Sequence, residues 1–347
     1  MRLRFVHSLA FCAALAGCSG CRRPETAHEG AGTLPQTTVL QGVAAAGEVG
    51  PPLVFSGRAM GVRVQLLVMG GAWERLSPAQ HAAMVELSSL EDIVNSWDNG
   101  SELSRWNDGL PAGGRVSPEL AELVGMALEL CAETGGAFDP TVGALLAARG
   151  HYGDSLPLGG APAELIGCDR VRLVAGADGM VLERLHPGVR LDLSGLAKGW
   201  AADRVKAQLV AAGVTNACLN LGSSTIVAWG PGPDGRGWAF RKPFSSTPDG
   251  EVWLVDEAVA TSGSTPRAVD PARLTGVHLV EPSEARFIES ESRVAVARGP
   301  AAAACDAWAT AALVSDVRPA PDSGVVTEVT ELVRELPLKP GAPQTTR

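Results

Sequence analysis

Stretches of alternating and of helical hydrophobic periodicity follow one another along the chain. Apolar and polar residues alternate from Val54 to Val68, which predicts one or two strands with an interruption at 57–61. Ser77-Pro78 then supplies a helix N-cap and a proline at the first helical position, ahead of an apolar face formed by Met84, Leu87, Leu90 and Val94. A second helix is predicted to begin in the same way at Ser117-Pro118 and to end at Gly135.

The second half of the chain continues this succession of elements. A helix is predicted to carry Ala201, Val205 and Leu209 on one face and to end at Gly213. Strands are predicted at about 216–229, 251–256, 277–281 and 292–298, and a last helix near Pro300. No internal repeat is visible. Strands that alternate with helices indicate one large domain of the α/β or α+β class.

The stretch LDLSGLAKGWAAD, residues 191–203, places two charges in an apolar context. Asp192 lies between two leucines of a strand-like triplet, ahead of the Ser194-Gly195 turn. Lys198 falls in the first turn of the following helix, where the helix dipole is unfavourable for a cation. A carboxylate and an ammonium beside a turn and a helix N-terminus indicate a site for an anionic ligand.

The N-terminus has the features of an export signal. Arg2 and Arg4 precede a short apolar stretch that ends in Leu15-Ala16-Gly17-Cys18. This ending resembles the bacterial lipobox, in which the cysteine is acylated and becomes the mature N-terminus; an ordinary signal peptide containing a cysteine is the alternative. We expect a signal peptide at 1–18, a flexible tether at 19–50, a folded domain at 51–335 and a loose tail at 336–347. Because Ser19 is no retention signal, we expect, for a bacterium with two membranes, a lipoprotein anchored in the outer membrane and facing the periplasm.

Composition narrows the class of protein. The chain has 347 residues, of which 46% are hydrophobic and 19% charged, as is typical of a globular protein. A net charge of -9 argues against a nucleic-acid partner, because phosphate binding requires clustered Lys and Arg. Of the seven cysteines, two belong to the signal segment, and the other five show no CxxC spacing and therefore indicate no zinc site. An oxidising compartment would allow a disulfide, but the spacing does not tell which cysteines pair.

Two further segments carry candidate chemistry. In GGAFDPTVGALL, residues 135–146, Asp139 precedes a proline, and its plainest interpretation is a helix N-cap. In ACDAWAT, residues 304–310, Asp306 and Thr310 lie four residues apart, so both oxygens share one face of a helix. Such oxygens suit Mg²⁺, although a buried Asp bonded to a Thr hydroxyl would have the same spacing.

Taken together and in this order, the motifs resemble those of the FAD:protein FMN transferases, the ApbE family. The resemblance covers about residues 54–315 and runs through seven short blocks: 57–61, 101–107, 136–143, 192–199, 220–222, 260–263 and 306–310. It implies an α+β fold, with one large domain related to the T-fold, mixed sheets and flanking helices. It also implies a reaction in which FAD is the substrate: with Mg²⁺, its pyrophosphate is split, FMN is attached to a Thr or Ser hydroxyl of an acceptor flavoprotein, and AMP is released.

The resemblance also implies roles for individual residues. The residues implied to contact FAD are Met60, Trp97, Ala137, Phe138, Asp139, Asp192, Lys198 and Glu281. The metal would lie between the side chains of Asp306 and Thr310 and the main-chain carbonyls of Gly195 and Ala309. Phosphoryl transfer depends mainly on positioning and charge neutralisation, which this set of groups would provide.

One segment departs from the pattern of the family. Where relatives carry His-x-x-Asp-Pro-x-Thr-Gly, this chain has the sequence HLVEPSEA at 278–285, so Glu281 replaces Asp and the Thr-Gly end is absent. His278 remains as the candidate base for the acceptor hydroxyl, with a hydrogen-bonded strand histidine as the alternative. Two other functions therefore stay open: an Mg²⁺-dependent FAD pyrophosphatase, and a flavin-binding lipoprotein that has lost turnover.

Overall fold

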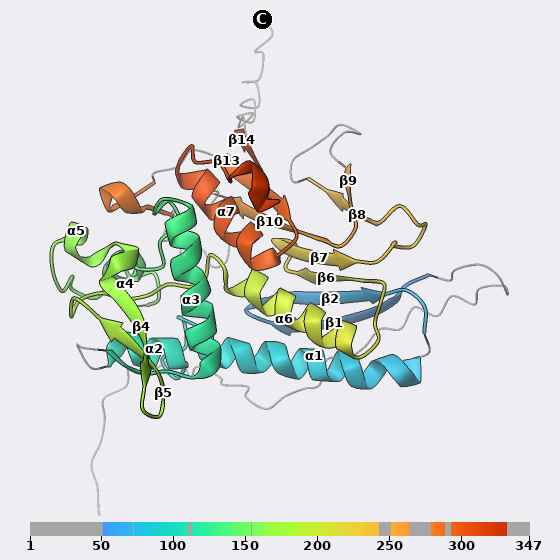
Figure 1. Ribbon diagram of the computed structural model, residues 1–347, viewed down its shortest axis with the longest axis horizontal. Helices are drawn as coiled ribbons and strands as arrows, with labels where there is room; N and C mark the ends of the chain where they lie inside the picture. The colour runs from blue at the N-terminus through green and yellow to red at the C-terminus, as the bar shows by residue number, and fades with distance from the viewer. Residues whose placement is uncertain are drawn as a thin grey trace, which may run out of the picture. The chain divides into compact units, whose positions relative to one another are not determined.

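A computed structural model describes residues 51–71, 73–109, 113–153, 155–242, 251–263, 279–288 and 293–331. Its centre is a seven-stranded sheet in the order β1-β2-β6-β7-β10-β13-β14 (Figure 1). The strands are β1 (Leu53–Ala59), β2 (Val62–Val68), β6 (Ala217–Leu221), β7 (Thr225–Trp229), β10 (Glu257–Gly263), β13 (Arg293–Gly299) and β14 (Val326–Glu331). Each neighbouring pair is antiparallel.

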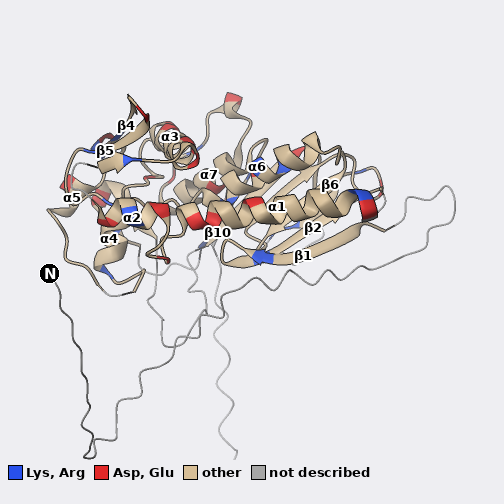
Figure 2. Ribbon diagram, turned by 90° about the horizontal axis from the view of Figure 1, so that it is seen from below, with Lys and Arg blue, Asp and Glu red and all other residues tan. Residues whose placement is uncertain are grey.

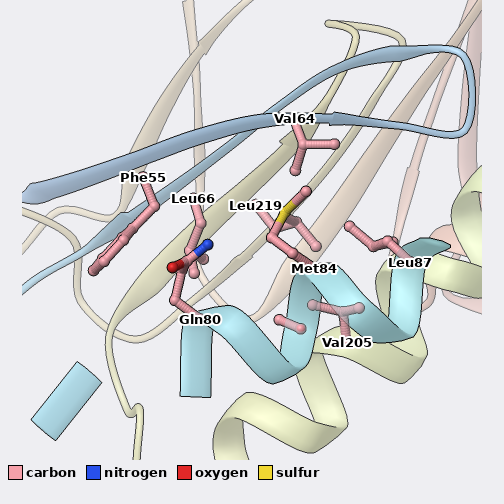
Figure 3. A pocket seen from close by; sticks show the side chains of 9 residues that line it. Phe55, Val64, Leu66, Gln80, Met84, Leu87, Val205 and Leu219 are labelled. Atoms are coloured by element: carbon pink, nitrogen blue, oxygen red, sulfur yellow. The ribbon is translucent and has the colours of Figure 1, made fainter. Parts of the chain in front are cut away.

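Three long helices cover one face of this sheet (Figure 1). They are α1 (Trp73–Val94), α6 (Ala197–Ala211) and α7 (Ala302–Val314). Figure 3 shows side chains of α1 pointing toward strands β1, β2 and β6, where Met84 and Leu87 face Val64 and Leu219 across a small apolar gap. Among the labelled side chains there, Gln80 is the polar one, and it is only 8% exposed.

The period-two pattern of the central strands divides the buried residues between two faces. Val227 and Ala258 belong to the large core under the helices, whereas their neighbours Ala228 and Val259 belong to a second cluster on the other face. The hairpin of β8 (Trp238–Arg241) and β9 (Glu251–Leu254) covers that second face. The sheet is therefore buried on both sides at its centre.

A smaller set of elements gathers at one end of the main sheet (Figure 1). Its helices are α2 (Glu102–Asp108), α3 (Pro118–Glu133), α4 (Gly143–Ala148) and α5 (Pro162–Leu165), and its three-stranded sheet is formed by β3 (Gly113–Arg115), β5 (Gly179–Arg184) and β4 (Val171–Gly176). The two-residue strands β11 (Val280–Glu281) and β12 (Arg286–Phe287) form a further hairpin. The observed class is α+β, as predicted.

Charged residues are interspersed over the described elements. Figure 2 shows acidic positions along α1, with basic positions scattered among the other elements. Among the residues described, no helix combines the length and the apolar character that crossing a membrane requires.

Several predicted boundaries are corrected. The first helix begins at Trp73, so Pro78 lies inside it and Ser77 is not its N-cap. The predicted strand at 216–229 is two strands, separated by a turn in which Gly222 and Ser223 adopt positive φ. The triplet 191–193 is not a strand; its neighbour Arg190 makes one isolated parallel bridge with Val142. The second predicted helix is confirmed, with Ser117 as its N-cap.

Candidate functional site

Three of the motifs that lie far apart in the sequence meet around Gly195. A Cβ atom added to Gly195 would lie 3.0 Å from Phe138 Cε2 and 3.5 Å from Thr310 Oγ1. Gly195 follows Ser194 in the turn before α6, Phe138 lies in the turn after α3, and Thr310 lies in α7. The fold therefore assembles the site where α3, α6 and α7 meet.

Asp306 is the buried carboxylate of this site, at 5% exposure. Its Oδ2 accepts a hydrogen bond of 2.7 Å from the main-chain amide of Gly199, and its Oδ1 accepts one of 3.0 Å from Thr225 Oγ1. These donors orient the carboxylate, and a buried charge requires such partners. Thr225, in β7, was not among the residues that the sequence pointed to.

Thr310 supplies a second oxygen on the same helix. Its hydroxyl lies 3.1 Å from the main-chain oxygen of Asp306 and 3.2 Å from Ser262 Oγ at the end of β10. Ala309 precedes it, and because a methyl side chain has no ligand atom, only the main-chain carbonyl oxygen of Ala309 could serve a metal ion. The set of carboxylate, hydroxyl and carbonyl oxygens fits a hard cation such as Mg²⁺.

Helices α6 and α7 are connected by hydrogen bonds from the first-turn amides of each to a carboxylate of the other. Asp203 of α6 accepts hydrogen bonds of 3.0 Å from the amides of Ala302 and of Ala303 in the first turn of α7. Asp306 of α7 accepts one from Gly199 in the first turn of α6. Burial raises the pKa of Asp203, and the two amide hydrogen bonds oppose that rise. Each helix thus places a carboxylate on the N-terminal amides of the other.

Asp192 is buried, although a polar residue between two leucines of a half-buried strand would normally point to water. Its Oδ1 accepts hydrogen bonds from the amide of Ser194 at 3.1 Å and from Ser194 Oγ at 2.5 Å, and its Oδ2 accepts one from the Tyr152 hydroxyl. The preceding residue is also fixed: the side-chain amide of Asn107 donates to Leu191 O at 2.9 Å and accepts from Leu191 N at 2.8 Å.

Lys198 lies in the first turn of α6, as predicted, and its side chain is half-buried. Within the described part of the chain, no carboxylate forms an ion pair with it. The N-cap residue Leu196 provides no side-chain hydrogen bond to this helix end. The amide of Gly199 already donates to Asp306 and that of Ala197 to Leu193 O, so Lys198 itself provides the positive charge for an anion at this helix end.

Asp139 is buried but is not a helix N-cap. Its Oδ1 accepts hydrogen bonds from the amide of Thr141 at 2.8 Å and from Thr141 Oγ1 at 2.5 Å, while α4 begins four residues later at Gly143. Thr141 Oγ1 also accepts a hydrogen bond from Gly167 N at 2.8 Å. Burial raises the pKa of Asp139, and the hydrogen bonds from Thr141 oppose that rise.

A disulfide joins Cys131 at the end of α3 to Cys168 in the loop after α5. Asp139 lies within 4.8 Å of both sulfur atoms, in the group of three potential ligands found among the described residues. Because the two thiols are oxidised to a disulfide, they are not available as thiolate ligands. The disulfide instead links the end of α3 to the segment next to Gly167, whose amide donates to Thr141 Oγ1 beside Asp139.

Met60 and Trp97 occupy different surroundings. Met60 adopts a positive φ of 54° in the β1–β2 turn, and its amide donates a 2.6 Å hydrogen bond to Glu91 Oε2. That amide is therefore already engaged by the protein. Trp97 is 52% exposed, and its ring contacts the rings of His151 and Tyr152.

The remaining candidates are less directly connected with this site. The Glu281 carboxylate in β11 forms an ion pair with Arg286, so it already has a basic partner within its own hairpin. His278 and Cys18 lie outside the described residues. Ala137 precedes Phe138 in the turn after α3 and packs against the core.

Comparisons with known proteins identify the family of the chain. The model of the ApbE family matches residues 60–323. A protein of Rhodobacter capsulatus named FAD:protein FMN transferase is 35% identical over 236 residues, a match that spans 64% of this chain and 43% of that protein. The protein of the same name from Salmonella typhimurium is 26% identical over 275 residues, or 75% of this chain and 78% of the relative.

Solved structures give the same result for the fold. The flavin transferase ApbE from Vibrio cholerae superposes with a TM-score of 0.61 at 24% identity, over 80% of this chain and 97% of that one. The ApbE protein from Thermotoga maritima superposes with a TM-score of 0.63 at 24% identity, over 76% and 86%. These structures share the single α+β domain, and the family model matches most of the described sequence. The chain belongs to the ApbE family.

Proposed function

We propose that this protein transfers FMN from FAD to a Thr or Ser hydroxyl of an acceptor flavoprotein, with Mg²⁺, and releases AMP. The relatives named FAD:protein FMN transferase support the transfer of FMN from FAD. The observation that carries the proposal is the meeting of Gly195, Phe138 and Thr310 beside the buried Asp306. These residues place oxygen ligands for a cation next to the Phe138 ring and to the N-terminus of α6, which carries Lys198.

The reaction needs charge neutralisation and positioning. A phosphorus–oxygen bond of the FAD pyrophosphate breaks, an ester bond forms between the FMN phosphorus and the acceptor oxygen, and the hydroxyl proton passes to a base. AMP departs with the bridging oxygen. Lys198 would bind the pyrophosphate, because it places positive charge at the N-terminal end of α6. His278 is the candidate base, on the resemblance to the family.

The metal would be held by the side chains of Asp306 and Thr310 and by the carbonyls of Gly195 and Ala309. When bound, Mg²⁺ would neutralise charge that develops on the phosphate oxygens. Gly199 and Thr225 fix the carboxylate that would bind it. Asp139 and Asp192 lie in hydrogen-bonded turns next to this centre and would accept hydrogen bonds from the nucleotide.

The decisive experiment incubates the purified protein with FAD and Mg²⁺, with and without an acceptor domain. Release of AMP only with the acceptor, together with a covalent flavin on it, supports the transferase. Release of AMP without an acceptor identifies a pyrophosphatase instead. Bound FAD without any AMP identifies a flavin-binding protein that has lost turnover. The altered segment 278–285 is the observation that favours this alternative.

The proposal includes a location. Residues 1–18 would be a lipoprotein signal, 19–50 a tether, 51–335 the transferase domain and 336–347 a loose tail, with the lipid on Cys18 at the outer membrane. The domain would then face the periplasm. Cys18→Ser should abolish incorporation of a fatty-acid analogue and leave the precursor uncleaved. Equal label on the variant would contradict the anchor without affecting the proposed reaction.

A further inference from the structure

Three aromatic rings from two distant segments form one cluster beside the site. The centroid of the Trp97 ring lies 4.9 Å from that of His151 and 5.8 Å from that of Tyr152, and the last two rings are 5.0 Å apart. All three pairs are tilted or edge-on, the arrangement that aromatic rings prefer. Trp97 is 52% exposed, whereas His151 and Tyr152 are half-buried. The cluster thus presents one indole ring to solvent and holds it with two others.

The same cluster reaches a buried carboxylate. The Tyr152 hydroxyl donates a hydrogen bond to Oδ2 of Asp192, while Ser194 occupies Oδ1 with two donors. Asp192 is only 7% exposed. Burying a carboxylate without hydrogen-bond donors is energetically unfavourable, so the Tyr152 hydroxyl helps to fix the position of the Asp192 carboxylate.

We propose that Tyr152 is a positioning residue that joins the exposed Trp97 ring to the Asp192 carboxylate, so that both bind one ligand with a flat heteroaromatic ring and a nearby hydroxyl or N–H donor. The inference rests on the proposed function, in which that ligand is FAD. A flat ring would stack on Trp97, and a donor on the same molecule would bind Asp192. Tyr152 contacts both partners and fixes their separation.

The charges around Tyr152 agree with this role. Burial raises the pKa of Tyr152 well above its ordinary value, the Asp192 carboxylate raises it further, and Arg190 opposes both effects. Burial lowers the pKa of His151, and Asp192 opposes that shift. Tyr152 therefore stays protonated at neutral pH and remains a hydrogen-bond donor to Asp192.

The first test is Tyr152→Phe, which removes the hydroxyl and keeps the ring. FAD affinity, measured by flavin fluorescence in EDTA, should fall about tenfold, the scale of one hydrogen bond to a charged group. In the transfer assay the KM for FAD should rise by a similar factor, with kcat at saturating FAD changed by less than about threefold. Ile166→Val is the matched control, because Ile166 lies in the apolar cluster against which Tyr152 packs and its aliphatic side chain cannot hydrogen-bond to Asp192. Its FAD affinity should equal that of the wild type.

A second measurement does not depend on that variant. Tyr152 is the single tyrosine of the chain, so the ultraviolet absorbance of tyrosinate reports on it alone. In the folded wild type it should titrate above the ordinary tyrosine range, and Asp192→Ala should move the titration down. In the Asp192→Ala background, Tyr152→Phe should no longer weaken FAD binding.

The outcomes separate this inference from the proposed function. If the wild type binds FAD and Tyr152→Phe binds it equally well, the positioning role is wrong and the transferase stands. A tyrosine titration that Asp192→Ala leaves unchanged also overturns the role, because Tyr152 would then not interact with Asp192 in solution. A wild type that binds no FAD removes both the function and the inference.

Discussion

The main-chain amide of Gly199 donates a 2.7 Å hydrogen bond to Oδ2 of Asp306, a residue 107 positions further along the chain. This bond connects the LDLSGLAKGW motif with the last helix. Of the side chains implied to bind the metal, Asp306 is the one that carries a charge, and its direction is set by that amide and by Thr225.

Asp306→Ala should abolish Mg²⁺-dependent turnover, while FAD still binds with reduced affinity, because the other groups proposed to bind FAD lie elsewhere. Turnover should be followed as AMP release at limiting Mg²⁺, and binding by flavin fluorescence. The control is Asp203→Asn, which alters a half-buried carboxylate on the facing helix and should still respond to Mg²⁺. Full activity of Asp306→Ala at limiting Mg²⁺ would exclude the metal site.

Gly199→Ala should destabilise the domain because α6 and α7 touch at this residue. A Cβ atom there would lie 2.3 Å from Ala302 O and 2.6 Å from Ala303 N, both main-chain atoms that cannot rotate away. Overpacking of this kind costs about 1–3 kcal/mol or more. Gly125→Ala is the matched control, since Gly125 lies in α3 and its Cβ would meet Leu173 at an ordinary 3.6 Å. The control should gain up to about 1 kcal/mol from helix propensity, and equal thermal midpoints of the two variants would refute the close contact.

Asp139→Asn should change how stability depends on pH. Since burial raises the Asp139 pKa above 3.8, the folded state holds this proton more tightly than the unfolded state. The wild type therefore loses stability relative to the unfolded chain as pH rises from about 3.8 through the raised pKa, and the amide variant is spared that loss. Melting curves should show the variant gaining on the wild type between pH 3.8 and neutral pH. The opposite trend would mean that hydrogen bonds from Thr141 outweigh burial.

Removing the disulfide should lower stability by about 3–4 kcal/mol, because it closes a loop of 37 residues in the unfolded chain. Cys131→Ser should show this loss in denaturant unfolding under oxidising conditions. The wild type should show it too once a reductant is added. Cys218→Ser is the control. Burial raises the pKa of the free Cys218 thiol to about 12, so this thiol should stay unreactive and its replacement should change the stability little.

His278→Ala should slow transfer to the acceptor by about a hundredfold, the usual scale for losing a general base. FAD affinity should stay nearly constant, since a neutral imidazole beside the hydroxyl adds little to it. Wild-type transfer should fall as pH drops through the titration of the histidine, and the variant should give a flatter profile. Equal rates for both proteins across pH would place the base elsewhere.

Much of the fold was predictable where local chemistry decided it. Ser117 and Pro118 fix the start of α3 because the hydroxyl caps the helix and the proline suits its first turn. The same pair at Ser77-Pro78 misled, because Leu76 packs on the core and extends α1 by a turn before the proline. Central strand β10 was missed since Ala258 and Ala260 have low strand propensity, and packing against α7 makes up for it.

The candidate site was predictable only as separate motifs. Spacing placed Asp306 and Thr310 on one helix face, and resemblance placed Asp192 near them. Nothing local indicated that Tyr152 would donate to Asp192 or that Asn107 would hold Leu191, because these pairs are separated by 40 and 84 positions. The pairing of Cys131 with Cys168 likewise follows from the fold and not from cysteine spacing.

The reciprocal hydrogen bonds between α6 and α7 have a consequence for the energetics of ligand binding. Asp203 and Asp306 hold the two helices in one relative position before any ligand arrives. A cation or pyrophosphate then meets groups already in place, and the conformational entropy of assembling them is lost during folding and not during binding. The site is thus preorganised on the side of α6 and α7, where affinity should depend little on whether an acceptor protein is present.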